Sequence, residues 1–82
     1  MRRHVQVLVT GSTGYLGRAI VRALDRAGHA VVAYSRSASA SGLPATAVDG
    51  DIRDAAGVAR AARDCNAIIH AAALVAVWRR RS

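Results

Sequence analysis

The sequence predicts an α/β fold, with a parallel sheet of about four strands and two helices. Two observations along the 82 residues predict it. Four short runs consist of apolar, often β-branched residues, which is typical of buried strands. Amphipathic helical stretches and a loop separate these runs, and buried strands joined by such crossovers form parallel sheets with right-handed connections.

The first half of the chain has the pattern strand, helix, strand. Residues 5–9, VQVLV, form a short β-branched run close to a glycine, which predicts a buried strand. Over residues 14–27 apolar side chains recur at helical spacing on one face and charged ones on the other, which predicts an amphipathic helix. Gly28 stands where a residue in the left-handed conformation would end that helix. The next run, HAVVAYS at 29–35, predicts the second strand.

The second half has the pattern loop, strand, helix, strand. Small and turn-forming residues over 36–45 predict a loop, and TAVDG at 46–50 predicts a short third strand. Asp54 is expected to cap a second helix that ends near Arg63. Residues 66–73 predict a fourth strand that is apolar enough to be covered on both faces.

Length and composition are those of one small domain, and residues 1–82 are interpreted as a single incomplete domain whose end, about 74–82, has no partner element. The net charge of +7 comes with 12 basic residues, all arginine, but no aromatic side chains are interleaved with them. Specific nucleic-acid binding is therefore not expected. The apolar run 67–78 is too short to cross a bilayer, and Cys65, the single cysteine, allows no disulfide. We expect a soluble, cytoplasmic protein without a membrane partner.

Three glycines at spacings of three, Gly11, Gly14 and Gly17, lie between the first strand and the first helix. The N-terminus of a helix carries about half a positive charge and unpaired N–H donors, so this turn suits an anion such as a pyrophosphate. Gly11 would allow the sharp turn, and Gly14 would leave no Cβ in the way of the phosphates. Gly17 would let the helix pack closely on the strand beneath it. Ser12 and Thr13 can add hydroxyl donors.

With Thr10 in front of it, the sequence TGSTGYLG resembles the fingerprint of the short-chain dehydrogenase/reductase superfamily. The form TGxxGxxG is similar to that of its extended, epimerase/dehydratase-like branch. The resemblance covers residues 5 to about 77 and implies the first part of a Rossmann fold that binds NAD or NADP. A glycine-rich turn without a nucleotide is the alternative. The cofactor-binding positions implied by the motif are Gly11, Ser12, Thr13, Gly14, Tyr15, Leu16 and Gly17.

The resemblance also implies contacts with the adenosine end of the cofactor. The second strand ends where the ribose is held, and an acidic residue there would favour NAD. Arg36 stands there instead, and a guanidinium pairs with a 2′-phosphate, so NADP is favoured over NAD. Asp51 would meet the adenine amino group, and Ile52 would pack near the ring. The alternatives are a solvated loop charge for Arg36 and a turn or capping residue for Asp51.

The sequence IIHAAA resembles the HxAA that follows the family's fourth strand. Small side chains there would leave room for the ribose and nicotinamide of the cofactor, which implies a binding role for Ala71, Ala72 and Ala73. We interpret His70 as a structural residue, because no carboxylate or nucleophile is paired with it in the local sequence.

The family's proton-transfer pair, Tyr-x-x-x-Lys, cannot come from this chain, because the chain has no lysine. No catalytic residue and no metal ligand is predicted. The favoured function is the NAD(P)-binding N-terminal segment of an oxidoreductase or epimerase, inactive alone. The alternatives are a stand-alone dinucleotide-binding or sensor module, one half of a split enzyme, and a small basic interaction protein. An open sheet edge at the fourth strand predicts pairing with a missing C-terminal half or self-association.

Overall fold

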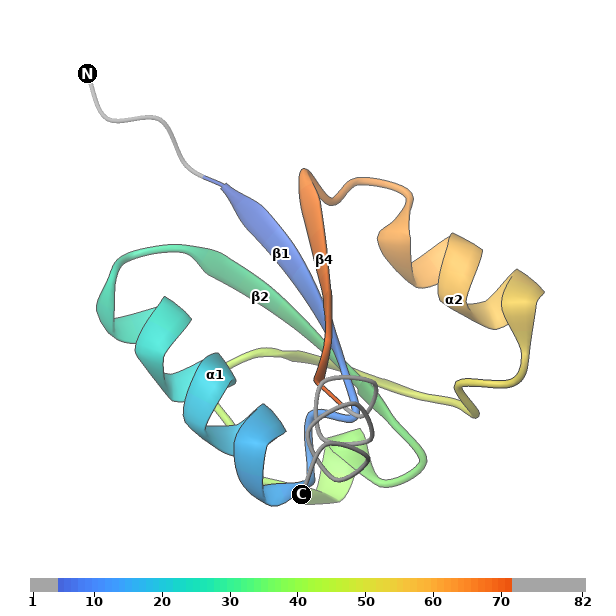
Figure 1. Cartoon of the computed structure of the whole chain (residues 1–82), viewed down its shortest axis with the longest axis horizontal. Helices are drawn as coiled ribbons and strands as arrows, with labels where there is room; N and C mark the ends of the chain where they lie inside the picture. The colour runs from blue at the N-terminus through green and yellow to red at the C-terminus, as the bar shows by residue number, and fades with distance from the viewer. Residues whose placement is uncertain (1–4, 72–82) are drawn as a thin grey trace, which may run out of the picture.

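The computed structural model describes residues 5–71, and these form a four-stranded parallel sheet with a helix on each face (Figure 1). The strand order is β3-β2-β1-β4. The predicted α/β class and the partial Rossmann fold are confirmed. In chain order the elements are β1 (Gln6–Thr10), α1 (Tyr15–Arg26), β2 (Ala30–Ser35), the short 3₁₀ helix η1 (Ala38–Ala40), β3 (Thr46–Asp49), α2 (Ala55–Ala62) and β4 (Ala67–His70).

Alternating side chains of the central strands build a separate core on each face of the sheet. Val7 and Val9 of β1 pack with Val21 of α1 on one face. Leu8 of β1 lies on the other face, packed with Tyr34 of β2 and the inner side of α2. Leu8 and Val9 are fully buried, so β1 is covered on both sides, as predicted for a central parallel strand.

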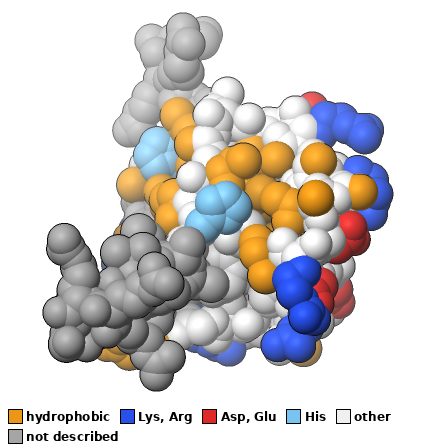
Figure 2. Space-filling view, turned by 45° about the vertical axis from the view of Figure 1, so that its right-hand side comes forward, with side chains coloured by type: hydrophobic (Ala, Val, Ile, Leu, Met, Phe, Trp, Pro, Cys, Tyr) orange, Lys and Arg blue, Asp and Glu red, His pale blue; other side chains and the backbone are white. Residues whose placement is uncertain are grey.

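The fourth strand differs from its prediction. β4 pairs with β1 alone among the described residues and forms an edge of the sheet. Most of its residues are exposed, with Ile68 46% exposed, so the expectation that both faces would be covered was wrong. Coverage depends on neighbours outside the strand. Figure 2 shows apolar side chains gathered on the side of the molecule where β4 and α2 lie. The predicted continuation to residue 73 and the tail at 74–82 lie outside the described residues.

The ends of the helices confirm one prediction and correct another. Gly28 adopts φ 89° and follows the end of α1, where its N–H donates to the Asp25 carbonyl at 3.0 Å. Asp54 occupies the N-cap position of α2, but its side chain makes no capping hydrogen bond. The predicted side-chain cap is therefore absent. Among residues 5–71, no helix has the length and apolar character needed to span a membrane.

The loop between β2 and β3 contains a short helix that the sequence did not predict. Asp49, at the end of β3, accepts hydrogen bonds from the Ser39 N–H at 2.8 Å and from its hydroxyl. These bonds, with the Ser39 hydroxyl bond foremost, lower the pKa of the Asp49 carboxyl. The contacts hold η1 against β3, so this loop is fastened close to the carboxyl ends of β2 and β3.

Candidate functional site: a glycine loop and an adjoining pocket

The glycine loop leaves the carboxyl end of β1, which lies beside the ends of its two neighbours. Thr10 is in register with Tyr34 of β2 and with His70 of β4. Gly11 then turns the chain in the left-handed conformation, φ 68°, and its N–H donates to the Tyr34 carbonyl at 3.0 Å. The sharp turn predicted at Gly11 is present, and it is the conformation that only glycine adopts without cost.

Gly17 meets the loop at very short range. A Cβ built on Gly17 would collide with the Gly11 carbonyl oxygen and lie 2.8 Å from the Ser12 Cα. The close approach predicted for Gly17 is therefore real, but its partner is the loop backbone and not the strand beneath. Within residues 5–71, a Cβ on Gly14 would have only one neighbour inside 4 Å, the Gly11 oxygen at an ordinary 3.5 Å.

The N-terminus of α1 presents unpaired donors. Among residues 5–71, the N–H groups of Tyr15, Leu16 and Gly17 have no hydrogen-bond acceptor, and the N-cap residue Gly14 offers no side chain. The first turn holds no acidic residue that would neutralise it. Arg18 braces the turn by donating from Nε to the Thr13 carbonyl at 3.0 Å. The positive end of the helix dipole is thus left free to hold an anion.

Ser12 adds an unpaired polar group to the same loop. Ser12 is fully buried, and its Oγ has no hydrogen-bond partner among the described residues. A buried hydroxyl without a partner costs about 1–3 kcal/mol, so such groups are uncommon unless a ligand or water satisfies them. Ser12 was predicted as a hydroxyl donor to phosphate. Its unpaired Oγ fits that prediction, which stays a prediction. Of the two residues between Gly14 and Gly17, Tyr15 is 95% exposed and Leu16 is half-buried.

A pocket of about 250 Å³ opens beside the glycine loop. The structure brings two of the three predicted adenosine-end residues, Arg36 and Ile52, together here. The Arg36 guanidinium makes no hydrogen bond within residues 5–71, and Ile52 is 48% exposed. The lining residues are Gly11, Thr13, Tyr34, Ser35, Arg36, Ser37, Gly50 and Ile52.

Asp51 lies next to this pocket but is engaged with a neighbour. Its carboxylate accepts hydrogen bonds from the Arg53 side chain, at 2.9 Å from Nη2 and 3.2 Å from Nε, and from the Arg53 N–H at 2.8 Å. These bonds, with a smaller contribution from the charge of Arg36, lower the pKa of Asp51 to about 2. The Asp51 carboxylate thus stabilises the turn at Arg53, as in the alternative interpretation of Asp51 as a turn or capping residue. A contact between Asp51 and an adenine stays a prediction.

Only one of the three alanines predicted to make room for the cofactor at the end of β4 lies within the described residues. Ala71 is 2% exposed and packs in the core with Val7 and Val21, and a contact between Ala71 and the cofactor stays a prediction. Ala72 and Ala73 lie outside the described residues. His70 shares a hydrogen bond of 2.8 Å between Nδ1 and the Thr10 Oγ1, which supports the structural interpretation of His70.

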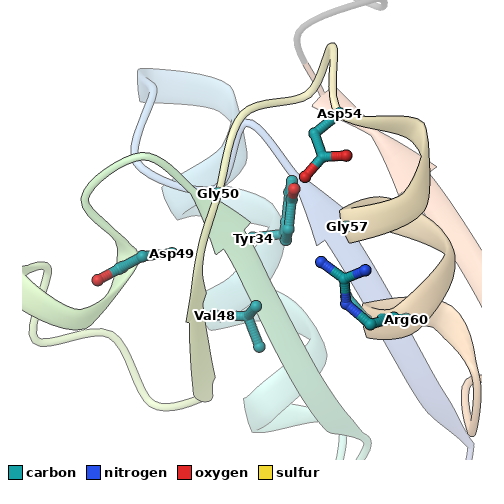
Figure 3. A pocket seen from close by; sticks show the side chains of 8 residues that line it. Tyr34, Val48, Asp49, Gly50, Asp54, Gly57 and Arg60 are labelled. Atoms are coloured by element: carbon teal, nitrogen blue, oxygen red, sulfur yellow. The ribbon is translucent and has the colours of Figure 1, made fainter.

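Tyr34 was missed by sequence reasoning, although it touches both loops of the site. Its side chain is 2% exposed, and its hydroxyl donates to the Asp51 carbonyl at 3.0 Å. Figure 3 shows Tyr34 between Gly50 and the first turn of α2, with Arg60 and Asp54 nearby; this second cavity has about 220 Å³. The sequence feature that could have indicated Tyr34 is its aromatic ring in a strand whose other residues are alanine, valine and a final serine. No cluster of potential metal ligands occurs in the described part of the chain.

These features define a class of protein: an α/β nucleotide-binding domain in which a glycine turn follows the first strand of a parallel sheet. The family model described as "NAD dependent epimerase/dehydratase family" matches residues 7–82. The chain belongs to this family.

Curated relatives agree with the family, but they are much longer. The chain is 45% identical over 78 residues to a divinyl chlorophyllide a 8-vinyl-reductase of Oryza sativa subsp. indica, a match that covers 80% of this chain and 19% of the relative. It is 33% identical over 76 residues to a 2-alkyl-3-oxoalkanoate reductase of Stenotrophomonas maltophilia, covering 90% and 23%. It is 37% identical over 71 residues to a decarboxylating sterol-4-alpha-carboxylate 3-dehydrogenase of Dictyostelium discoideum, covering 82% and 22%. The chain thus spans about a fifth of the length of these relatives.

Proposed function

We propose that this chain binds NADP as the cofactor-binding segment of an oxidoreductase or epimerase. The observation that carries the proposal is the unpaired N-terminus of α1 beside a glycine turn, next to a pocket that exposes an arginine. Two features of the loop fit a phosphate ligand: the unpaired, buried Ser12 Oγ and the open space at Gly14. Family membership supports a dinucleotide as that ligand.

Each part of the cofactor has residues suited to hold it. The N–H groups at Tyr15 and Leu16 would bind the pyrophosphate, since they lie at the positive end of α1 and have no acceptor in the described part of the chain. The Arg36 guanidinium would pair with a 2′-phosphate, which is the basis for favouring NADP over NAD. Ile52 would offer its exposed apolar surface to the adenine. When bound, a nicotinamide cofactor supplies hydride transfer.

Proton transfer would have to come from other residues than these. The chain contains no lysine, so it cannot form a Tyr-x-x-x-Lys pair. We therefore assign this segment the binding and orientation of the cofactor and not the acid–base step. Because the chain spans only about a fifth of these relatives, we assign the substrate site and the acid–base step to the remainder of such a protein.

The open edge of β4 supports a partner as well. β4 has a strand on one side only among residues 5–71, and Ile68 is 46% exposed. An unpaired edge with apolar side chains favours the addition of another strand. We propose that further chain of the longer family members pairs there, and that a second copy takes this place when the 82-residue chain is alone.

A titration of the purified 82-residue chain with NADPH tests the cofactor proposal. Gly14→Val should abolish binding, because a branched side chain would occupy the space in front of the α1 N–H groups. Ala23→Val is the matched control: it adds a branched side chain at an exposed position of the same helix and should bind NADPH normally. Equal binding by the unaltered chain and Gly14→Val would refute the site. No binding by the unaltered chain would favour the small basic interaction protein instead.

A further inference from the structure

We propose that Tyr34 is a positioning residue for the adenosine end of the cofactor, because it ties the loop after β3 to the glycine loop. This inference rests on the proposed dinucleotide binding and adds a residue that acts through other residues. Tyr34 lies at the carboxyl end of β2, in register with Thr10, the residue that precedes the glycine turn. It also lines the pocket that exposes Arg36 and Ile52.

The main chain and the side chain of Tyr34 hold different loops. Its carbonyl accepts the Gly11 N–H at 3.0 Å and so fixes the start of the glycine turn. Its hydroxyl donates at 3.0 Å to the carbonyl of Asp51, which is the residue before Ile52. One residue therefore sets the distance between the phosphate side of the pocket and its adenine side.

The other hydrogen bonds of the loop after β3 are local or lie at the edge of the sheet, among them those from Arg53 to the Asp51 carboxylate. The Asp51 carbonyl also accepts the Asp54 N–H at 2.9 Å, and the Gly50 N–H donates to the Ser35 carbonyl at 2.9 Å. Both are local or edge contacts, whereas the Tyr34 side chain belongs to the core with Leu8 and is 2% exposed. The bond from Tyr34 thus anchors an exposed loop directly to the buried core of the fold.

Two glycines, Gly50 and Gly57, lie so close to this hydroxyl that neither has room for a Cβ. A Cβ on Gly50 would collide with the Tyr34 Oη and lie 2.6 Å from its Cζ. A Cβ on Gly57, in the first turn of α2, would lie 2.8 Å from the same Oη. Gly57 lies inside a helix, where glycine costs about 1 kcal/mol relative to alanine. The close approach of both the Tyr34 hydroxyl and the Asp54 Oδ2, at 2.7 Å from that Cβ, gives a physical reason for glycine at this position.

Tyr34→Phe tests the inference, because it removes the hydroxyl and keeps both the ring and the main-chain bond to Gly11. We expect NADPH and 2′-phospho-ADP-ribose to bind about fivefold more weakly, the equivalent of about 1 kcal/mol for one net hydrogen bond. Inorganic pyrophosphate, which needs only the glycine loop, should bind with unchanged affinity. Calorimetry or NMR titration of the 82-residue chain measures all three ligands.

Ser41→Ala is the matched control. The Ser41 hydroxyl also donates to a main-chain carbonyl, that of Ala38 at 2.7 Å, but Ser41 does not line the pocket. Its loss should affect stability without affecting any of the three ligands. A second variant, Gly50→Ala, forces the Tyr34 hydroxyl aside and should weaken adenosine binding at least as much as Tyr34→Phe. Equal weakening of all three ligands by Tyr34→Phe, or no weakening, would overturn the positioning role.

Amide hydrogen exchange separates this inference from the proposed function, since it needs no ligand. In Tyr34→Phe the Asp54 N–H should exchange faster, while the Gly11 N–H should be unchanged. Unchanged exchange at Asp54 would show that the hydroxyl does not hold the loop, whatever the chain binds. If the variants do not fold, the unaltered chain decides: its Asp54 N–H should exchange as slowly as its Gly11 N–H, and faster exchange overturns the inference.

Discussion

Replacing Gly17 with alanine tests the tightest contact in the glycine loop. The added Cβ would be directed at the Gly11 carbonyl oxygen, 2.8 Å from the Ser12 Cα and 2.9 Å from the Gly11 carbonyl carbon. All three neighbours are backbone atoms, so no flexible side chain can move away. Helix α1 would have to shift away from the loop, or the loop would have to leave the end of β1.

The expected loss of stability combines two opposing terms. Overpacking of a tight site costs about 1–3 kcal/mol, and a backbone-only clash belongs at the upper end of that range. Replacing glycine by alanine inside a helix returns about 1 kcal/mol. The net effect of Gly17→Ala is therefore a destabilisation of about 2 kcal/mol. For a domain of this size, that corresponds to a fall in Tm of about 8–16 °C.

Thermal unfolding followed by circular dichroism measures this effect, with Gly14→Ala as the control. A Cβ at Gly14 meets only one atom, at 3.5 Å, and Gly14 has an ordinary φ of −73°. Gly14→Ala should therefore unfold within about 4 °C of the unaltered chain, since nothing in the described structure opposes it. Equal Tm values for Gly17→Ala and the unaltered chain would refute the assignment of Gly17 to close packing.

Three further predictions concern charge and association. Arg36→Asp should weaken NADPH roughly tenfold more than NADH in parallel titrations, because a charged hydrogen bond to the 2′-phosphate is lost; unchanged selectivity would make Arg36 a solvated loop charge. Arg53→Ala should raise the pKa of Asp51 from about 2 toward its ordinary value of 3.8, as NMR titration of the carboxyl would show. Because the folded pKa is depressed, the contribution of this pair to stability is present above pH 3.8 and is lost as the pH falls toward 2. Ile68→Lys should reduce self-association of the 82-residue chain in analytical ultracentrifugation, and an unchanged monomer fraction would exclude β4 as the contact.

Local pattern was sufficient to predict the order of the four strands and the two α-helices, but not the short helix η1. The apolar run at 5–9 and the helical spacing at 14–27 are properties of neighbouring residues, and the structure has β1 and α1 in those places. The burial of β4 could not be predicted in the same way. A strand as apolar as AIIH fits both the centre and the edge of a sheet, and the elements on either side of it decide which.

The candidate site likewise combines features that local sequence predicts with features that it does not. The turn at Gly11 and the close approach at Gly17 follow from spacing within one strand–turn–helix unit, and both are present. The role of Tyr34 depends on Asp51, 17 residues away, and on the two glycines that surround its hydroxyl. No short-range pattern connects these positions. The pairing of Asp51 with Arg53 is local, but a carboxylate beside an arginine fits a ligand contact equally well.

Of the three loop glycines, Gly14 is the one that no feature of the described structure requires. Gly11 needs its left-handed φ of 68°, and Gly17 has no room for a Cβ. Gly14 has neither constraint: its backbone is extended and its Cβ position is open. Within residues 5–71, no contact requires glycine at this position, which supports the proposed phosphate ligand. A phosphate bound to the N–H groups of Tyr15 and Leu16 would lie next to Gly14, because those donors begin directly after Gly14 and have no acceptor in the described chain.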